Sequence, residues 1–165
     1  MKFNYVKAYF SQLSNLGFQL LMLPMILFIL YYSQSVIKLP DLRLFNEQNS
    51  RIIFYVIGVL SVTLLTAVQM IANRKAELIS KEVGLGIKLE KLEKVLSRKM
   101  KEISCAVALM PIMLLITGDS YFSIAFAAVI AWYFIQWPTP SRVCRLLKLR
   151  GDEREMIITR GEAFK

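Results

Sequence analysis

The chain has 165 residues, of which 56% are apolar, and it carries a formal net charge of +9. This apolar share exceeds that of a typical soluble domain, and charged residues are nearly absent from four stretches and crowded between them. The separation excludes an ordinary soluble core, in which polar and apolar residues alternate at short period. It predicts an all-α integral membrane protein with four transmembrane helices, arranged as two tandem helical hairpins, plus a cytoplasmic amphipathic helix.

The four apolar stretches are the predicted membrane spans. The first covers about residues 16–37, and the second, residues 52–72, contains no charge. About twenty apolar residues in a helix cross the hydrocarbon core of a bilayer. The third and fourth, roughly residues 103–118 and 121–137, are shorter and are separated only by Gly118-Asp119-Ser120, which predicts a tight turn.

These spans divide the chain into four segments. The first hairpin and its short N-terminal cytoplasmic segment occupy residues 1–74, a basic amphipathic linker 75–102, the second hairpin 103–138 and a cytoplasmic tail 139–165. Lysine and arginine crowd the linker and the tail, whereas the turn between the last two spans carries only Asp119. By the positive-inside rule, both termini and the linker are expected in the cytoplasm, which suits a multi-pass protein of the cytoplasmic (inner) membrane.

The two hairpins resemble each other in sequence. Pro24 in the first span and Pro111 in the third stand in similar apolar surroundings, and Gln69 and Gln136 lie near the cytoplasmic ends of the second and fourth spans. A true duplication and chance similarity both remain open. Each proline removes a backbone hydrogen bond, so we expect helix kinks at both. The two glutamines are candidate interhelical or pore-lining residues, because an amide in lipid requires a hydrogen-bonding partner.

The linker contains an apolar stripe at helical spacing, and the opposite face carries lysines, arginines and glutamates. We expect this helix to continue into the third span. Two interpretations are open: the stripe lies on the inner leaflet with the basic face near anionic headgroups, or it docks against another polypeptide or a second copy of the chain. The candidate contact residues are Leu85, Leu89, Leu92, Leu96 and Met100.

The tail shows helical and extended features. Pro138 and Pro140 end the fourth helix, and Ser141 is expected to cap a short helix that reaches Leu149. Residues 156–159 have strand character, and so short a strand requires another sheet edge. A disordered end of the tail is the alternative.

No pattern in the sequence indicates a reaction. The chain has no histidine, and no charged residue occurs in the central parts of the predicted spans, where transporters and membrane enzymes place their ionisable groups. We therefore expect no enzymatic activity, no cofactor and no metal site. Nucleic acid is not expected as a partner, because acidic residues dilute each basic segment.

These features favour a non-catalytic subunit or scaffold of a larger cytoplasmic-membrane assembly. Its contacts are expected through the transmembrane bundle, the amphipathic linker and the C-terminal tail. The expected partners are the anionic headgroups of the cytoplasmic face, and either other membrane-protein subunits or further copies of the chain. The alternative is a homo-oligomeric pore or a carrier of a small molecule or lipid, with Gln69 and Gln136 lining the path.

Overall fold

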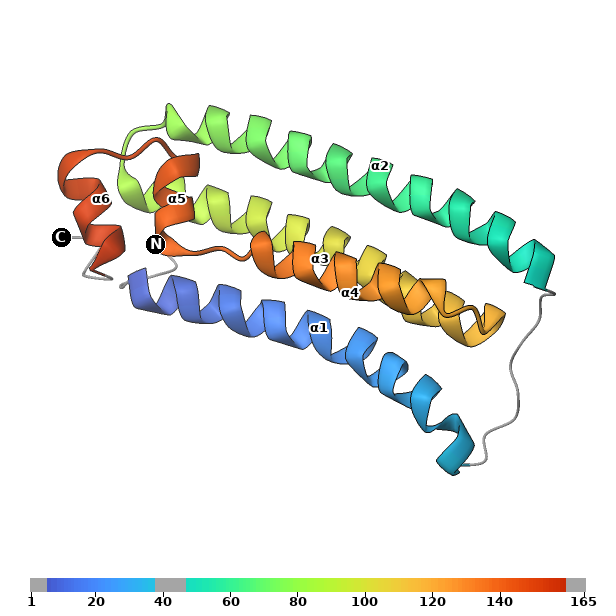
Figure 1. Ribbon diagram of the computed structural model, residues 1–165. Helices are drawn as coiled ribbons and strands as arrows, with labels where there is room; N and C mark the ends of the chain where they lie inside the picture. Colours follow the sequence, from blue (N-terminus) through green and yellow to red (C-terminus); the bar gives the residue numbers. More distant parts are fainter. Residues whose placement is uncertain (1–5, 38–46, 160–165) are drawn as a thin grey trace. The chain divides into compact units, whose positions relative to one another are not determined.

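The computed structural model describes residues 6–37 and 47–159, and within them all regular structure is helical. The helices are α1 (Val6–Ile37), α2 (Glu47–Ser80), α3 (Leu85–Thr117), α4 (Tyr121–Ile135), α5 (Pro140–Leu146) and α6 (Gly151–Ile158) (Figure 1). The all-α prediction is confirmed for this part of the chain. Five basic residues lie outside the described part of the chain: Lys2, Lys38, Arg43, Arg160 and Lys165.

The hydropathy of these helices makes the chain a multi-pass membrane protein. Three described segments are long and apolar enough to cross a membrane: Val6–Ser33, Asn49–Ser80 and Leu85–Thr117. A fourth span is present if α4 and α5, which are separated by a short break, count together. The structure thus supports three spans, and up to four.

The long helices exceed the thickness of a bilayer. The 34 residues of α2 correspond to about 51 Å at 1.5 Å per residue, whereas the hydrocarbon core is about 30 Å thick. In α3, the amphipathic stripe and the third predicted span form one continuous helix, as expected. The predicted linker is nevertheless divided, because α2 continues to Ser80 and a turn at residues 81–84 precedes α3.

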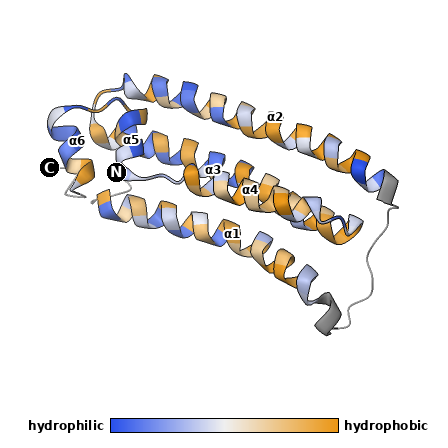
Figure 2. Cartoon of the chain, in the orientation of Figure 1, coloured by the Kyte–Doolittle hydropathy of each residue, from blue (hydrophilic) through white to orange (hydrophobic). Residues whose placement is uncertain are grey.

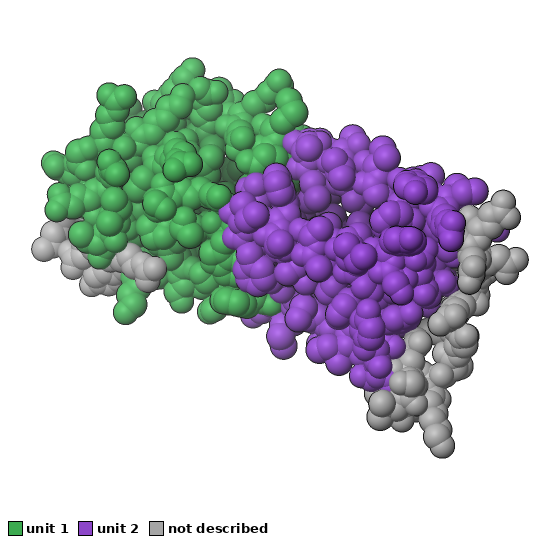
Figure 3. Space-filling model, in the orientation of Figure 1, with its two compact units in different colours: residues 1–18, 68–100, 137–165 green, residues 19–67, 101–136 purple. Residues whose placement is uncertain are grey.

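The chain forms two compact units (Figure 3). Unit 1 comprises residues 1–18, 68–100 and 137–165, and unit 2 comprises residues 19–67 and 101–136. Apolar residues predominate along the helices of unit 2, whereas polar and apolar residues are mixed in unit 1 (Figure 2). Each long helix therefore contributes to both units.

Unit 2 is held together by aromatic and polar contacts between its helices. The rings of Phe28 and Phe126 stack with centroids 4.6 Å apart, and the Ser104 hydroxyl donates a hydrogen bond of 2.7 Å to the Leu20 carbonyl. The turn between α3 and α4 begins at Gly118, whose φ of 69° is a conformation that glycine adopts without strain. The predicted tight turn between these two helices is confirmed.

The structure does not support a hairpin repeat. The second helix of the first hairpin, α2, has 34 residues, whereas its counterpart α4 has 15. Pro24 and Pro111 lie inside α1 and α3, and both helices continue past them. The similarity between the hairpins is thus confined to short stretches of sequence.

The tail differs from its prediction. Residues 156–159, expected to be extended, belong to α6 and its C-cap, and Ile157 is fully buried. Asp152 and Glu153 lie in the first turn of α6, where carboxylates interact favourably with the helix dipole. The N-cap of α5 is Thr139 rather than the predicted Ser141, and the helix spans Pro140–Leu146 rather than reaching Leu149.

A close approach at Gly17 fixes the packing of unit 1. A Cβ atom at this position would lie 2.5 Å from Met100 Cε and 2.7 Å from the Trp137 ring. The Trp137 ring also contacts Phe18, with centroids 4.9 Å apart. A Cβ here would force the Met100 methyl group and the Trp137 ring to move, so glycine suits this close contact of α1 with α3 and the segment before α5.

Gly17→Ala is expected to destabilise the protein by about 1–3 kcal/mol, the usual cost of overpacking. The matched control is Gly58→Ala, because a Cβ there meets nothing within 4 Å, and this change is expected to be neutral or stabilising by about 0.5–1 kcal/mol. Thermal unfolding of both variants in one detergent, followed by circular dichroism, tests this difference. Equal shifts for the two variants would contradict the packing described.

Candidate functional site

The most distinctive cavity of unit 1 lies at α5 and α6. It has a volume of about 420 Å³ and is lined by Ser141, Cys144, Arg145, Lys148, Leu149, Arg150, Arg154 and Ile158. We call it the basic pocket. A hydrogen bond of 3.9 Å from the Cys144 thiol to the Arg154 carbonyl joins the two helices. Val143, Leu147 and Ile157 are buried and provide the apolar support of this region.

The end of α5 is shaped by an unusual backbone conformation at Lys148. The Leu149 N–H bonds the Cys144 carbonyl at 3.0 Å, and the Lys148 N–H bonds the Arg145 carbonyl at 3.2 Å. This pair of bonds is the Schellman motif, whose left-handed position is usually occupied by glycine. Here Lys148 occupies it with φ of 52°, which costs a residue with a Cβ about 1–2 kcal/mol. The strain is local to the basic pocket.

The charges of the basic pocket have one sign. Of the described residues that line it, four are cationic and none is acidic. The Lys148 ammonium pairs with Glu77 at 2.8 Å. Within residues 6–37 and 47–159, no ion pair joins Arg145, Arg150 or Arg154 to an acidic side chain. The pocket therefore presents an excess of positive charge.

One of the two acidic neighbours of Arg154 in sequence, Glu153, pairs with a lysine of another helix. Both carboxylate oxygens of Glu153 accept hydrogen bonds from Lys88 of α3, at 3.0 and 3.3 Å. The Lys88 side chain is largely buried, so this pair is better shielded from solvent than most surface pairs. It joins α6 to α3, and it means that Glu153 does not pair with the arginines of the pocket.

The cysteine of the basic pocket is not a strong nucleophile. Burial raises the pKa of the Cys144 thiol, and this effect outweighs the lowering by Arg154 and by a backbone hydrogen bond. At neutral pH the group is therefore a thiol, which reacts far more slowly than a thiolate. The chemistry that the pocket offers is electrostatic.

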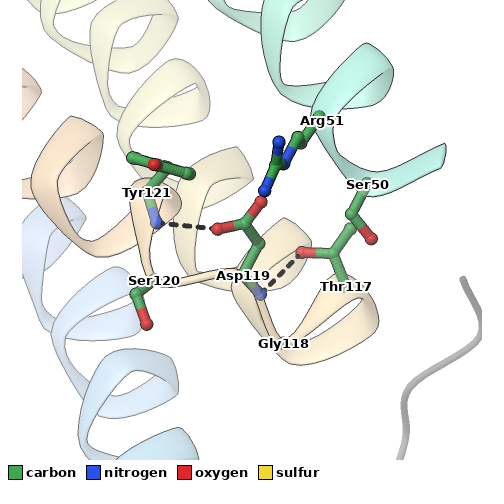
Figure 4. A pocket seen from close by; sticks show the side chains of 7 residues that line it. All are labelled: Ser50, Arg51, Thr117, Gly118, Asp119, Ser120 and Tyr121. Atoms are coloured by element: carbon green, nitrogen blue, oxygen red, sulfur yellow. Dashed lines mark hydrogen bonds between the residues drawn. The ribbon is translucent and has the colours of Figure 1, made fainter. Parts of the chain in front are cut away.

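A second, smaller cavity lies in unit 2 at the turn between α3 and α4 (Figure 4). Its volume is about 270 Å³ and it is lined by Ser50, Arg51, Thr117, Gly118, Asp119, Ser120 and Tyr121. The side chains of Arg51 and Asp119 point toward one another. Asp119 also accepts a hydrogen bond of 3.1 Å from the Tyr121 N–H at the start of α4. With charges of opposite sign, this cavity is better explained as part of the turn than as an anion site.

Comparison with protein-family models, with curated proteins and with solved structures gives no match.

The five residues of the predicted contact stripe are all buried. Leu85, Leu89, Leu92, Leu96 and Met100 are at most 7% exposed. Their apolar surface is covered by the chain itself, so contact with lipid or a partner is not needed to account for the stripe. We do not retain them as candidate contact residues.

The structure gives the two glutamines separate environments. The Gln69 side-chain amide donates a hydrogen bond of 3.0 Å to Asn73 in the same helix, and its carbonyl oxygen is buried without a hydrogen-bond partner among the described residues. Gln136 is the C-cap of α4, and its backbone N–H bonds the carbonyls of Trp132 and Tyr133. The hydrogen bond of the Gln69 amide thus stays within its helix.

Sequence reasoning missed two buried charges in α3. Glu93 is 7% exposed and Lys99 is 6% exposed, although both belong to the face that the sequence predicted to be polar. One carboxylate oxygen of Glu93 has no hydrogen-bond partner in the described chain. Since these two charged residues are buried as well as the leucines, α3 is packed on more than one side. The spacing of the leucines predicts only one buried face.

Two single substitutions, Lys148→Gly and Lys148→Ala, test whether the backbone at this position is strained. Both Lys148→Gly and Lys148→Ala remove the exposed pair with Glu77, worth about 0–1 kcal/mol, but only glycine removes the clash of the left-handed conformation. We expect Lys148→Gly to be more stable than Lys148→Ala by about 1 kcal/mol. Denaturant or thermal unfolding in one detergent measures the difference. An alanine variant as stable as the glycine variant would refute the strain.

Proposed function

We propose that this chain is a non-catalytic subunit or scaffold of a larger assembly in the cytoplasmic membrane, with both termini in the cytoplasm. The observation that carries the proposal is the exposure of three apolar side chains at or near the turn between α2 and α3: Leu78, Val83 and Ile87, with Val83 87% exposed. We call these three residues the hairpin tip.

The surroundings of the hairpin tip distinguish it from lipid-facing surface. Lys81, Glu82 and Lys88 lie between or beside its apolar residues, and Lys91 pairs with Glu82. The basic residues of this segment favour the cytoplasmic side under the positive-inside rule. Exposed apolar side chains rimmed by charges in an aqueous segment are typical of a protein–protein contact. The hairpin tip therefore replaces the buried stripe as the expected contact element.

The expected occupant is another membrane-protein subunit. The turn at residues 81–84 follows a helix that runs through both units, so a partner bound there is held beside the membrane. A contact of this size is small, and further area would come from the apolar side chains of the spans. These two kinds of surface together account for the composition of the chain without a catalytic site.

A photoreactive benzoylphenylalanine at Val83 tests the contact in native membranes. We expect a discrete cross-linked product that contains a different protein. The matched control is the same label at Val59, which is 69% exposed in the apolar part of α2 and is expected to label lipid. Adding Leu78→Asp should abolish the product at position 83, because a carboxylate disfavours an apolar contact. Lipid adducts alone at both positions would refute the proposal.

The alternative function is a homo-oligomeric pore or carrier. The observation that favours it is the side-chain carbonyl oxygen of Gln69, which is buried without a hydrogen-bond partner among the described residues. Under the scaffold proposal, proteoliposomes with the wild-type chain should pass small solutes no faster than empty ones. Gln69→Leu combined with Gln136→Leu should then leave both flux and assembly unchanged. A wild-type flux that the double variant loses, with assembly intact, would favour the pore.

A further inference from the structure

The basic pocket holds more positive charge than the acidic side chains of residues 6–37 and 47–159 neutralise. Arg145 comes from α5, Lys148 and Arg150 from the turn that follows, and Arg154 from α6. Glu77 compensates Lys148 alone. Arg145, Arg150 and Arg154 line the same cavity, and like charges around one cavity raise the electrostatic energy.

The lining of the pocket indicates what kind of anion it fits. Guanidinium groups present forked N–H donors that match the oxygens of phosphate groups, and the Ser141 hydroxyl adds a donor at the wall. Leu149 and Ile158 form an apolar part of the same wall. A volume of about 420 Å³ lies within the range of sites for small molecules. A phosphate that carries an apolar substituent matches both parts of this lining.

The strained conformation of Lys148 is a second, independent observation at this site. Glycine at this position would relieve the backbone, yet the chain has there a lysine that is among the lining residues and pairs with Glu77. Residues held in rare backbone conformations cluster at binding sites, where the strain positions a group for a ligand. The turn thus holds a cation in the pocket at a cost to the fold.

We propose that the basic pocket binds a phosphate-bearing anion, a phosphomonoester or phosphodiester, through Arg145, Lys148, Arg150 and Arg154. Two sources share this chemistry: the headgroup of an anionic phospholipid and a soluble phosphate ester. The inference concerns α5 and α6 only. It does not depend on a partner at the hairpin tip.

The experiment uses the full chain in nanodiscs and two probes. In the first arm, discs of phosphatidylcholine with one-fifth phosphatidylglycerol are compared with pure phosphatidylcholine discs, and native mass spectrometry counts the retained phosphatidylglycerol. In the second arm, glycerol 3-phosphate is titrated into pure phosphatidylcholine discs by calorimetry. Retention in the first arm without binding in the second identifies a lipid headgroup, and binding in the second identifies a soluble ester. Failure of both arms overturns the proposal.

Two double variants that remove the same charge distinguish binding at the basic pocket from non-specific electrostatic attraction of the anion to the protein. Arg145→Gln with Arg154→Gln is expected to weaken binding at least tenfold. The control, Lys75→Gln with Lys81→Gln, removes the same charge from exposed residues of unit 1 that do not line the pocket, and it is expected to change binding less than twofold. Equal losses in the two double variants would overturn the proposal.

A second variant keeps the test valid if the first double variant unfolds. Lys148→Gly removes one cation of the pocket while relieving its backbone, so this chain should fold at least as well as a Lys148→Ala chain. We expect it to bind the same probe several-fold more weakly than the wild type. Unchanged binding by a folded Lys148→Gly variant would exclude Lys148 from the site and contradict the proposal.

Discussion

Backbone N–H and C=O groups must be hydrogen-bonded within the protein wherever the chain meets hydrocarbon, and this constraint determines the course of α1, α2 and α3. A helix satisfies it, and a helix that has formed adds a bond with each further residue. Each of these three helices has more than 30 residues, which exceeds the length that a bilayer requires. The surplus turns form unit 1 together with α5 and α6. A ligand or partner bound to unit 1 is therefore attached to helices that enter the apolar part of the chain.

The membrane character of the chain could be predicted because it depends on composition over short windows. A stretch such as residues 52–72 needs no information from the rest of the chain to be recognised as a span. The leucine stripe of α3 was likewise recognised as helical from its spacing. What covers the stripe could not be predicted, since unit 1 joins three separate segments of the sequence. The spacing of the apolar residues predicts that one face of the helix is buried, but it does not identify the segments that pack against that face.

The tail shows where local propensity fails. Ile157 and Ile158 favour a strand by residue type, yet a strand gains hydrogen bonds only from a neighbouring strand. As a helix, the same segment buries Ile157 and brings Glu153 into an ion pair with Lys88. Arg154 stands between acidic residues in the sequence, and this pattern does not predict that it lines a cavity together with Arg145. Its place beside Arg145 depends on the turn at Lys148, and no sequence rule places a lysine where glycine is preferred.

The turn between α5 and α6 is thus the point at which the chain departs from the rules that account for its other parts. Elsewhere, glycine occupies left-handed positions, as at Gly84 and Gly118, and described lysines such as Lys91 and Lys94 are paired with glutamates. At this turn a lysine takes the strained position, and three arginines share a cavity without an acidic partner in the described chain. Folding alone does not explain why backbone strain and charge repulsion occur at the same turn. A glycine in place of Lys148 would remove the strain, and a glutamate beside the arginines would remove the repulsion. An anion in the cavity would offset the repulsion among the three arginines and lie beside the strained lysine, which also pairs with Glu77, so a single ligand accounts for both departures.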